Sequence, residues 1–143
     1  MLSRKIVIYS KEGSIIAEAA IMIPILVGLT FFIIEFGNAL YLSNTLSQIA
    51  RTAARYASVT PSYTQNDIVN VSGANSLLPD ISKFSLTINP SPGTTRAVGT
   101  IITVTVQYNY IPIINPFGFF NSNEAWAPII KSGAVTRSEV SNA

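Results

Sequence analysis

Ala19-Ala-Ile-Met-Ile-Pro-Ile-Leu-Val-Gly-Leu-Thr-Phe-Phe-Ile-Ile34 is an apolar run of 16 residues without a charged side chain. As a helix it would extend about 24 Å, which is short of a hydrocarbon core of about 30 Å. The chain stays mostly apolar through Leu42, and residues 19–42 would give about 36 Å of helix. We therefore expect one transmembrane helix over about residues 19–42, surrounded by membrane lipid.

Two other interpretations of this run are weaker. A cleaved secretory signal has an apolar core of about 7–15 residues and then a small-residue cleavage site. Here the apolar run is longer, and the sequence after Tyr41 continues at helical period. A buried helix of a soluble protein is also disfavoured, because a domain this small could not cover a helix that is apolar on all sides.

The basic residues beside the run predict its orientation. Arg4, Lys5 and Lys11 precede it, whereas the nearest basic residues after it are Arg51 and Arg55. Cytoplasmic flanks of membrane helices carry the excess of Lys and Arg. We therefore expect residues 1–13 to form a cytoplasmic leader and the C-terminal domain to lie on the extracytoplasmic side.

Three residues of the anchor are candidate functional residues. Glu18 and Glu35 bracket the apolar run, and ionisable residues at membrane depth usually have a partner or a role. Placement of both carboxylates in the headgroup zones is the alternative. Pro24 lacks a backbone donor and disfavours the helical state of the residue before it, so we expect a kink there.

The helical pattern continues beyond the membrane segment. Small and apolar residues recur at spacings of three and four, the pattern of one buried helix face, at Leu46, Ile49, Ala50, Ala53, Ala54 and Ala57. Polar residues occupy another face, at Ser47, Arg51, Arg55 and Ser58. We expect one helix over residues 14–58, ended by Pro61 and its neighbours.

Residues 59–143 are expected to form a small α+β domain. A long helix that begins in the membrane and packs on such a domain resembles a type IV pilin in layout. Thr64 and Asp67 resemble a helix start, with Ile68, Val71, Asn75 and Leu78 on one face and Pro79 as the stop.

Alternating residues predict a strand over 84–88 and a second over about 98–111, and a third fits about 125–140, with Trp126 near its start. Such alternation favours an antiparallel sheet with a helix on one side. The loop between the last two strands holds Phe117, Phe119 and Phe120, which we interpret as core residues under the loop in preference to a partner-binding tip.

Composition argues against catalysis. Charged residues make up 11% of the chain, the net charge is +2, and there is no Cys or His. Disulfides, thiol chemistry and the commonest metal ligand are therefore excluded. The remaining carboxylates are scattered, no Gly-rich phosphate loop is present, and no basic stripe is visible. We expect no enzyme activity, cofactor, metal, nucleic acid or small-molecule substrate.

Three segments together resemble a known family: Gly13-Ser-Ile-Ile-Ala-Glu18-Ala-Ala-Ile-Met-Ile-Pro24, Ile34-Glu35-Phe36-Gly37 and Ile49-Ala-Arg51-Thr-Ala-Ala-Arg55-Tyr56-Ala57. As an ordered set they resemble the TadE-like family of pilus-assembly proteins, the minor pseudopilins of tight-adherence (Flp) systems. The resemblance covers about residues 13–58. The Arg137-Ser-Glu139 pattern near the C-terminus is similar to the family in layout only.

The resemblance implies a processing event. Prepilin peptidases cut after a glycine just before the apolar helix, with a glutamate as fifth residue of the mature chain. Here Gly13 precedes Ser14, and Glu18 is the fifth residue from Ser14. The Flp pattern has Tyr after this glutamate, whereas this chain has Ala19. An uncleaved chain, with Glu18 as a helix N-terminal acid favoured by the dipole, is the alternative.

The resemblance also implies a function and partners. It implies assembly of a Flp-type (type IV) pilus at the bacterial cytoplasmic membrane, by helix packing in the membrane or the filament. Its partners would be a prepilin peptidase, other pilins or pseudopilins, and the inner-membrane assembly platform. A single-pass membrane-anchored binding or sensing module is the alternative. An accessory subunit of a membrane enzyme complex, with Glu35 in a proton or helix-pairing role, is a third possibility.

Overall fold

The computed structural model describes residues 11–113 and 128–142, with only the backbone of residues 11 and 12. The chain is α+β, with a long apolar helix followed by short helices and a three-stranded antiparallel sheet. It divides into one unit that ends at Phe36 and a second that begins at Gly37. The two units are described separately below.

Helix α1 spans Lys11–Val59 and contributes to both units. The predicted helix over residues 14–58 is confirmed, although it begins three residues earlier. Pro24 lies inside it, and the helix continues on both sides of this residue. The helix ends just before Pro61, a residue that has no backbone N–H and cannot continue the hydrogen-bond pattern.

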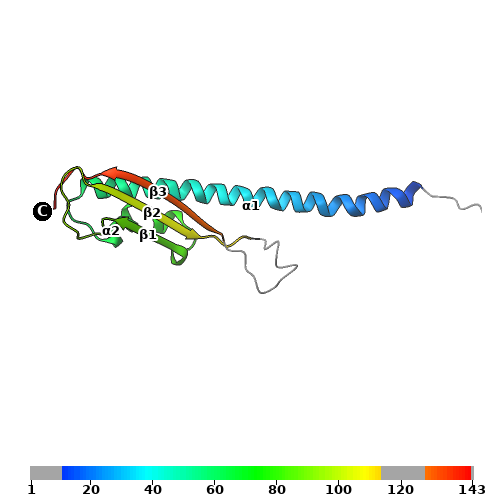
Figure 1. Cartoon of the computed structure of the whole chain (residues 1–143). Coiled ribbons are helices and arrows are strands. Elements are labelled where there is room, and N and C mark those ends of the chain that lie inside the picture. The colour runs from blue at the N-terminus through cyan, green and yellow to red at the C-terminus, as the bar shows by residue number, and fades with distance from the viewer. Residues whose placement is uncertain (1–10, 114–127, 143) are drawn as a thin grey trace, which may run out of the picture. The chain divides into compact units, whose positions relative to one another are not determined.

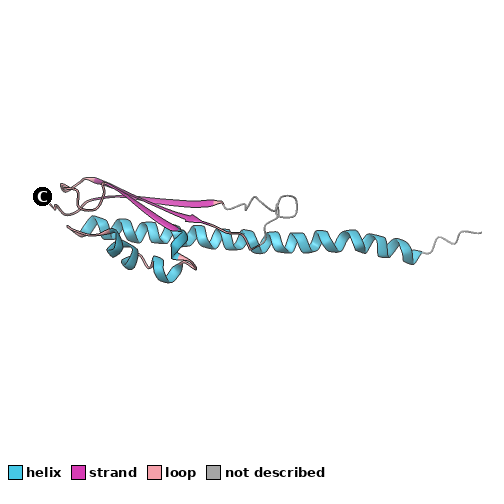
Figure 2. Ribbon diagram, turned by 90° about the horizontal axis from the view of Figure 1, so that it is seen from below, coloured by secondary structure: helices cyan, strands magenta, loops and turns pink. Residues whose placement is uncertain are grey.

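The second unit contains one sheet with the strand order β1-β2-β3 (Figure 1). Strand β1 spans Phe84–Asn89, β2 spans Ile101–Asn109 and β3 spans Ile129–Arg137. Both pairings are antiparallel, with Leu86 opposite Val106 and Val104 opposite Ala134. The strands form one layer, and the helices lie on one side of it (Figure 2).

The three predicted strands are present, with shorter bounds for two of them. Strand β2 begins at Ile101 and not at residue 98, because Gly99 has a φ of +89°, outside the extended region. Strand β3 begins at Ile129 and ends at Arg137. Trp126 and the three phenylalanines of the preceding loop, Phe117, Phe119 and Phe120, lie outside the described residues.

The core of this unit joins the second part of α1 to the inner face of the sheet. All six predicted stripe residues of α1 are buried, as is Leu42. Facing them are the inward residues of β1 and β2, Leu86, Ile88, Ile102, Val104, Val106 and Tyr108. Ser47 also lies near the sheet, and its hydroxyl oxygen is 3.0 Å from that of Ser132 in β3. Small side chains along the stripe allow this close approach of helix and sheet.

This close approach leads to a stability prediction. Ala53 has no exposed surface, so Ala53→Leu is expected to force shifts in the packed layer and to cost about 1–3 kcal/mol. Thr52→Leu is a matched control because Thr52 is exposed on the same helix. Urea unfolding of the detergent-solubilised chain measures both variants. Equal midpoints for the two would contradict the close packing.

The predicted helix after Thr64 is present but broken in two. Helix α2 spans Gln65–Val71 and helix α3 spans Ala74–Leu77. Between them Gly73 adopts a φ of +74°, a left-handed conformation that interrupts the helix. The expectation of one continuous apolar face was therefore wrong: Ile68 and Leu78 are buried, but Val71 and Asn75 are exposed.

The start of α2 follows the prediction. Thr64 and Asp67 form a capping box, in which the Thr64 hydroxyl accepts from the Asp67 backbone N–H and the Asp67 carboxylate accepts from the Thr64 backbone N–H. The hydrogen bonds from Thr64 lower the pKa of Asp67.

The end of α1 is held by a side chain distant in sequence. The Arg96 guanidinium donates to the carbonyl oxygens of Ala57 (2.9 Å), Thr60 (2.8 Å) and Pro61 (3.0 Å). Its carbon Cζ lies 4.7 Å from the centroid of the Tyr63 ring. The last carbonyls of a helix have no intrahelical partner and carry partial negative charge. Arg96 therefore satisfies the C-terminal end of α1.

Arg96 is only 2% exposed, and the N–H groups of its guanidinium donate hydrogen bonds to protein acceptors. A further N–H group donates to the Tyr63 hydroxyl at 3.2 Å. Burial raises the pKa of Tyr63, although the nearby Arg96 cation acts in the opposite direction. No carboxylate among the described residues lies within ion-pair distance of Arg96. Carbonyl dipoles and an aromatic ring therefore stabilise this buried cation.

The C-terminal segment closes over the same region. The Glu139 backbone N–H donates to the Ser58 carbonyl (2.8 Å), and the Asn142 backbone N–H donates to the Arg96 carbonyl (3.2 Å). The Asn142 side chain accepts from the Arg96 backbone N–H and donates to the Thr94 carbonyl. Ser58 is therefore buried beneath this segment, and its assignment to the polar helix face was wrong.

Candidate functional site: the exposed apolar part of α1

The part of α1 that ends at Phe36 has no core of its own. From Ile15 to Phe36 the large apolar side chains are between 46% and 70% exposed. Exposing a large apolar side chain to water costs about 1.5–3 kcal/mol relative to burial. A run of this length could not persist in water without a covering, so this surface requires lipid or other helices around it.

Length and composition fit a membrane helix. The helix Gly13–Val59 contains an 18-residue window with a mean hydropathy of 2.3, and none of that window is buried within the molecule. By these two criteria it is able to cross a membrane. A core helix of a soluble protein would instead be mostly buried, and no such burial is found here.

The predicted site residues all lie on this helix. Gly13, Ser14, Glu18 and Pro24 are exposed, and Glu35 is half-buried. Glu18 and Glu35 are 17 positions apart, which is about 25 Å along a helix. The two carboxylates therefore mark opposite ends of the apolar run and do not form one site.

Gly13 and Ser14 lie in the first turn of α1. The first N–H groups of a helix have no intrahelical acceptor, so this turn is the least costly part of the helix to unwind. Ser14 and Glu18 are four residues apart and share one face. A peptidase that cuts an extended segment would need to unwind this single turn.

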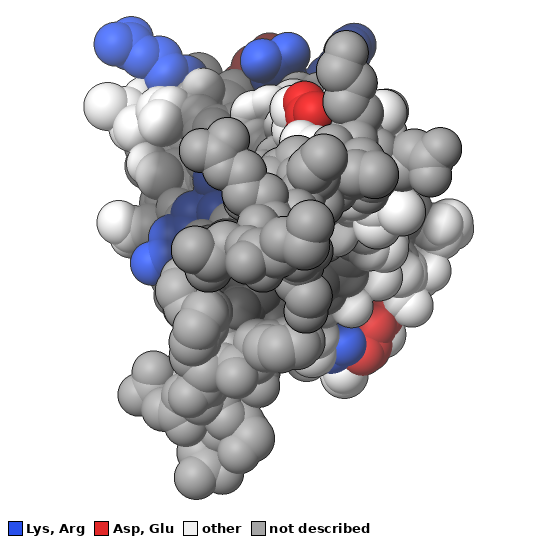
Figure 3. Space-filling view, turned by 90° about the vertical axis from the view of Figure 1, so that its right-hand side faces the viewer, with Lys and Arg blue, Asp and Glu red and all other residues white. Residues whose placement is uncertain are grey.

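Charged groups are sparse around the site. On the face shown in Figure 3, Lys and Arg side chains of the described residues appear at separate places and form no single basic patch. Across residues 11–113 and 128–142, no cluster of three or more His, Cys, Asp or Glu side chains could hold a metal ion.

A second feature, which the sequence reasoning missed, is a cavity of about 380 Å³ in the unit that begins at Gly37. Asn38, Tyr41 and Leu42 of α1 form one wall, and Tyr108, Tyr110 and Ile111 at the end of β2 form another. Lys83 lies at its border. Its residues come from three distant segments, so no local pattern indicated it.

The family comparison covers the same helix. A family model described as TadE-like protein matches residues 13–55. Over this stretch, the chain is similar to the TadE-like family. The matched stretch is under a third of the chain, and it ends within α1. The predicted resemblance is thereby confirmed over residues 13–55.

The TadE-like segment contains every predicted site residue, from Gly13 to Glu35, together with Arg51 and Arg55. It includes both the exposed apolar part of α1 and most of the buried stripe, but no residue of the sheet. No curated protein and no solved structure matches the chain. The family relation therefore rests on the helix alone.

Proposed function

We propose that the chain is a minor pseudopilin-like subunit that serves in assembly of a Flp-type tight-adherence pilus. The observation that carries the proposal is the apolar part of α1, exposed from Ile15 to Phe36 and contained in the TadE-like segment. In the membrane this surface would contact lipid, and in an assembly it would pack against the same helix of other subunits. The sheet domain would be carried by the helix, and no catalytic step is assigned to it.

The proposed location is the bacterial cytoplasmic membrane. Residues 1–13 would lie in the cytoplasm, residues 19–42 would cross the bilayer, and the domain after residue 58 would be extracytoplasmic. The excess of basic residues before the helix supports this orientation. The partners would be a prepilin peptidase, other pilins or pseudopilins, and the inner-membrane assembly platform.

Processing after Gly13 forms part of the proposal. Cleavage would create an amine at Ser14, which could pair with the Glu18 carboxylate of a neighbouring subunit, because isolated charges are costly in lipid. In cells with a working prepilin peptidase, N-terminal sequencing of the membrane-extracted protein is expected to begin at Ser14. An intact Met1 in those cells would contradict the cleavage.

Glu18 provides the test of the assembly function. Glu18→Ala removes the carboxylate that would receive the neighbour's amine, and it is expected to abolish piliation in an otherwise complete system. Glu139→Ala is the matched control, because it removes an exposed carboxylate from the domain. Surface pili are counted by electron microscopy, and protein levels by immunoblot. Normal piliation of the Glu18→Ala strain would favour a membrane-anchored binding module instead.

A further inference from the structure

One end of the sheet domain carries exposed apolar side chains that its core does not use. Ile111 is 58% exposed and Ile129 is 53% exposed, and both lie at the end of the sheet where Asn109 pairs with Ile129. Tyr41 of α1, which is 62% exposed, lines the cavity at this end together with Ile111. Apolar groups gathered on a domain surface indicate a contact surface.

The position of this end along the chain indicates what it contacts. Asn38 and Tyr41 follow Ile34 by four and seven residues in the same helix, which is about 6–11 Å of helix length. If the apolar run occupies the hydrocarbon core, this short stretch of chain keeps these residues close to the headgroups, whatever the orientation of the rest of the domain. Tyr41 and Tyr110, which are at least partly exposed, line the cavity there, and tyrosines are enriched at membrane–water interfaces.

Two lysines provide charge complementarity to a lipid surface. Lys83 borders the cavity, and Lys131 is opposite Gln107 near the same end of the sheet. Lysines close to a bilayer are attracted to anionic headgroups. The arrangement thus combines apolar side chains, tyrosines and cations, which is the combination that an anionic bilayer surface accepts.

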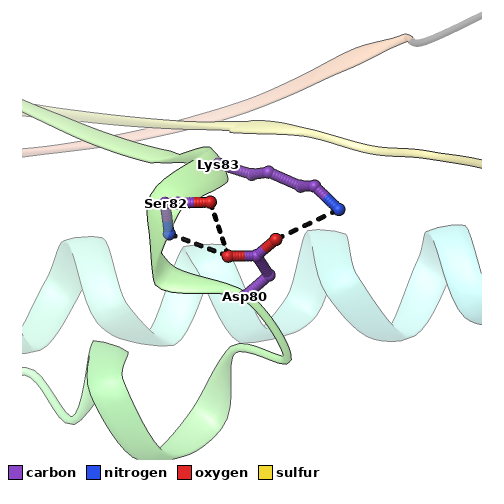
Figure 4. A network of polar contacts seen from close by, with 3 residues as sticks. All are labelled: Asp80, Ser82 and Lys83. Carbon is purple, nitrogen blue, oxygen red and sulfur yellow. Dashed lines mark hydrogen bonds and ion pairs between the residues drawn. The ribbon is translucent and has the colours of Figure 1, made fainter.

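The nearby carboxylate of Asp80 offsets the charge of Lys83 while the two are paired, but the pairing does not fix the ammonium in place. Its Oδ2 lies 3.2 Å from Lys83 Nζ, while Oδ1 accepts from the backbone N–H and hydroxyl of Ser82 at 3.0 and 2.6 Å (Figure 4). The Lys83–Asp80 pair is partly exposed, and exposed ion pairs contribute little to stability. The Asp80 carboxylate would retain its hydrogen bonds from Ser82 if the Lys83 ammonium turned towards a lipid phosphate.

We propose that this end of the domain, formed by Tyr41, Lys83, Ile111, Ile129 and Lys131, rests on the anionic headgroups of the bilayer that holds α1. The contact would fix the domain at the membrane surface before the subunit enters an assembly. This inference rests on the proposed membrane anchoring of α1. A second copy of the chain is the competing occupant of the same surface.

The natural absence of Cys makes a depth measurement direct. Ile111→Cys in the full chain is labelled with an environment-sensitive fluorophore and reconstituted in vesicles of phosphatidylcholine with phosphatidylglycerol. Ile101→Cys is the matched control: it is 57% exposed against 58% for Ile111, at the other end of a strand about 30 Å long. The same label on Phe32→Cys, within the apolar run, reports whether this part of α1 is inserted in the bilayer.

Spin-labelled lipid is expected to quench the fluorophore at residue 111 severalfold more than that at residue 101. Lys83→Gln, or vesicles of phosphatidylcholine alone, should reduce this difference. Equal quenching at residues 111 and 101, with strong quenching at residue 32, would overturn the surface contact and leave the anchor intact. Shielding of residue 111 from aqueous iodide without lipid quenching would assign the surface to a second copy. Absence of quenching at residue 32 would overturn the anchor itself, and the surface contact with it.

Discussion

Arg96→Ala is expected to lower the free energy of unfolding of the sheet domain by about 3 kcal/mol, at the upper end for single substitutions, because it breaks a buried hydrogen-bond network. The substitution leaves the carbonyls of Ala57, Thr60 and Pro61 without their donor, and it removes the cation from the Tyr63 ring. A buried acceptor without a partner costs about 1–3 kcal/mol. Small domains are stable by only about 5–15 kcal/mol, so much of the margin would be lost.

Urea unfolding of the detergent-solubilised full chain, followed by near-UV circular dichroism, measures this loss. Arg137→Ala is the matched control, because Arg137 is exposed at the end of β3 and its removal is expected to change stability by less than about 0.5 kcal/mol. Arg96→Lys should give an intermediate loss, because one ammonium lacks the planar fork that reaches several acceptors. Equal midpoints for Arg96→Ala and Arg137→Ala would contradict the role of Arg96.

Leu26→Arg is expected to remove most of the chain from the membrane fraction. Leu26 lies in the middle of the apolar run and is 59% exposed. An arginine at the centre of a membrane helix costs about 2.5–3.5 kcal/mol, which is a factor on the order of one hundred in insertion. The substitution does not disturb the core, because Leu26 is outside the unit that begins at Gly37.

Ile101→Arg is the matched control for this variant. Ile101 is 57% exposed on the sheet, so the same charge is added at a similar exposure outside the apolar run. Alkaline extraction followed by flotation of membranes separates inserted from released protein. Retention of Leu26→Arg at the level of the control would show that the apolar run does not anchor the chain.

The sequence predicted those parts of the fold that depend on local periodicity. The small-residue stripe from Leu46 to Ala57 indicated the buried helix face, and the alternation around Val104 indicated β2 and its inward residues. These patterns are readable because burial repeats at 3.6 residues in a helix and at 2 in a strand.

Contacts between distant segments could not be read in the same way. Arg96 lies in a turn-rich stretch and resembles a solvated residue, yet it holds the end of α1 across more than thirty residues of sequence. The helical pattern placed Ser58 on the polar face, but the C-terminal segment covers it and it is buried. Only the break at Gly73 had a local signal, because a glycine inside a short helical pattern permits a left-handed turn.

The candidate site was largely predictable, because it consists of one helix. Gly13, Ser14, Glu18, Pro24 and Glu35 all lie on α1, and the family model covers them. A kink at Pro24 and cleavage after Gly13 remain predictions. The cavity beside Lys83 was not predictable, because it depends on how the end of β2 lies beside residues 38–42 of α1.

We propose that the exposed apolar part of α1 is the surface by which subunits of the assembly recognise one another. A photoreactive amino acid at position 26, introduced in cells that carry the complete pilus system, tests it most directly. Irradiation is expected to yield adducts with another pilin-type subunit, identified by mass spectrometry, and these adducts should be lost in the Glu18→Ala background. Adducts with lipid alone, in cells whose chain retains Glu18, would contradict this recognition role.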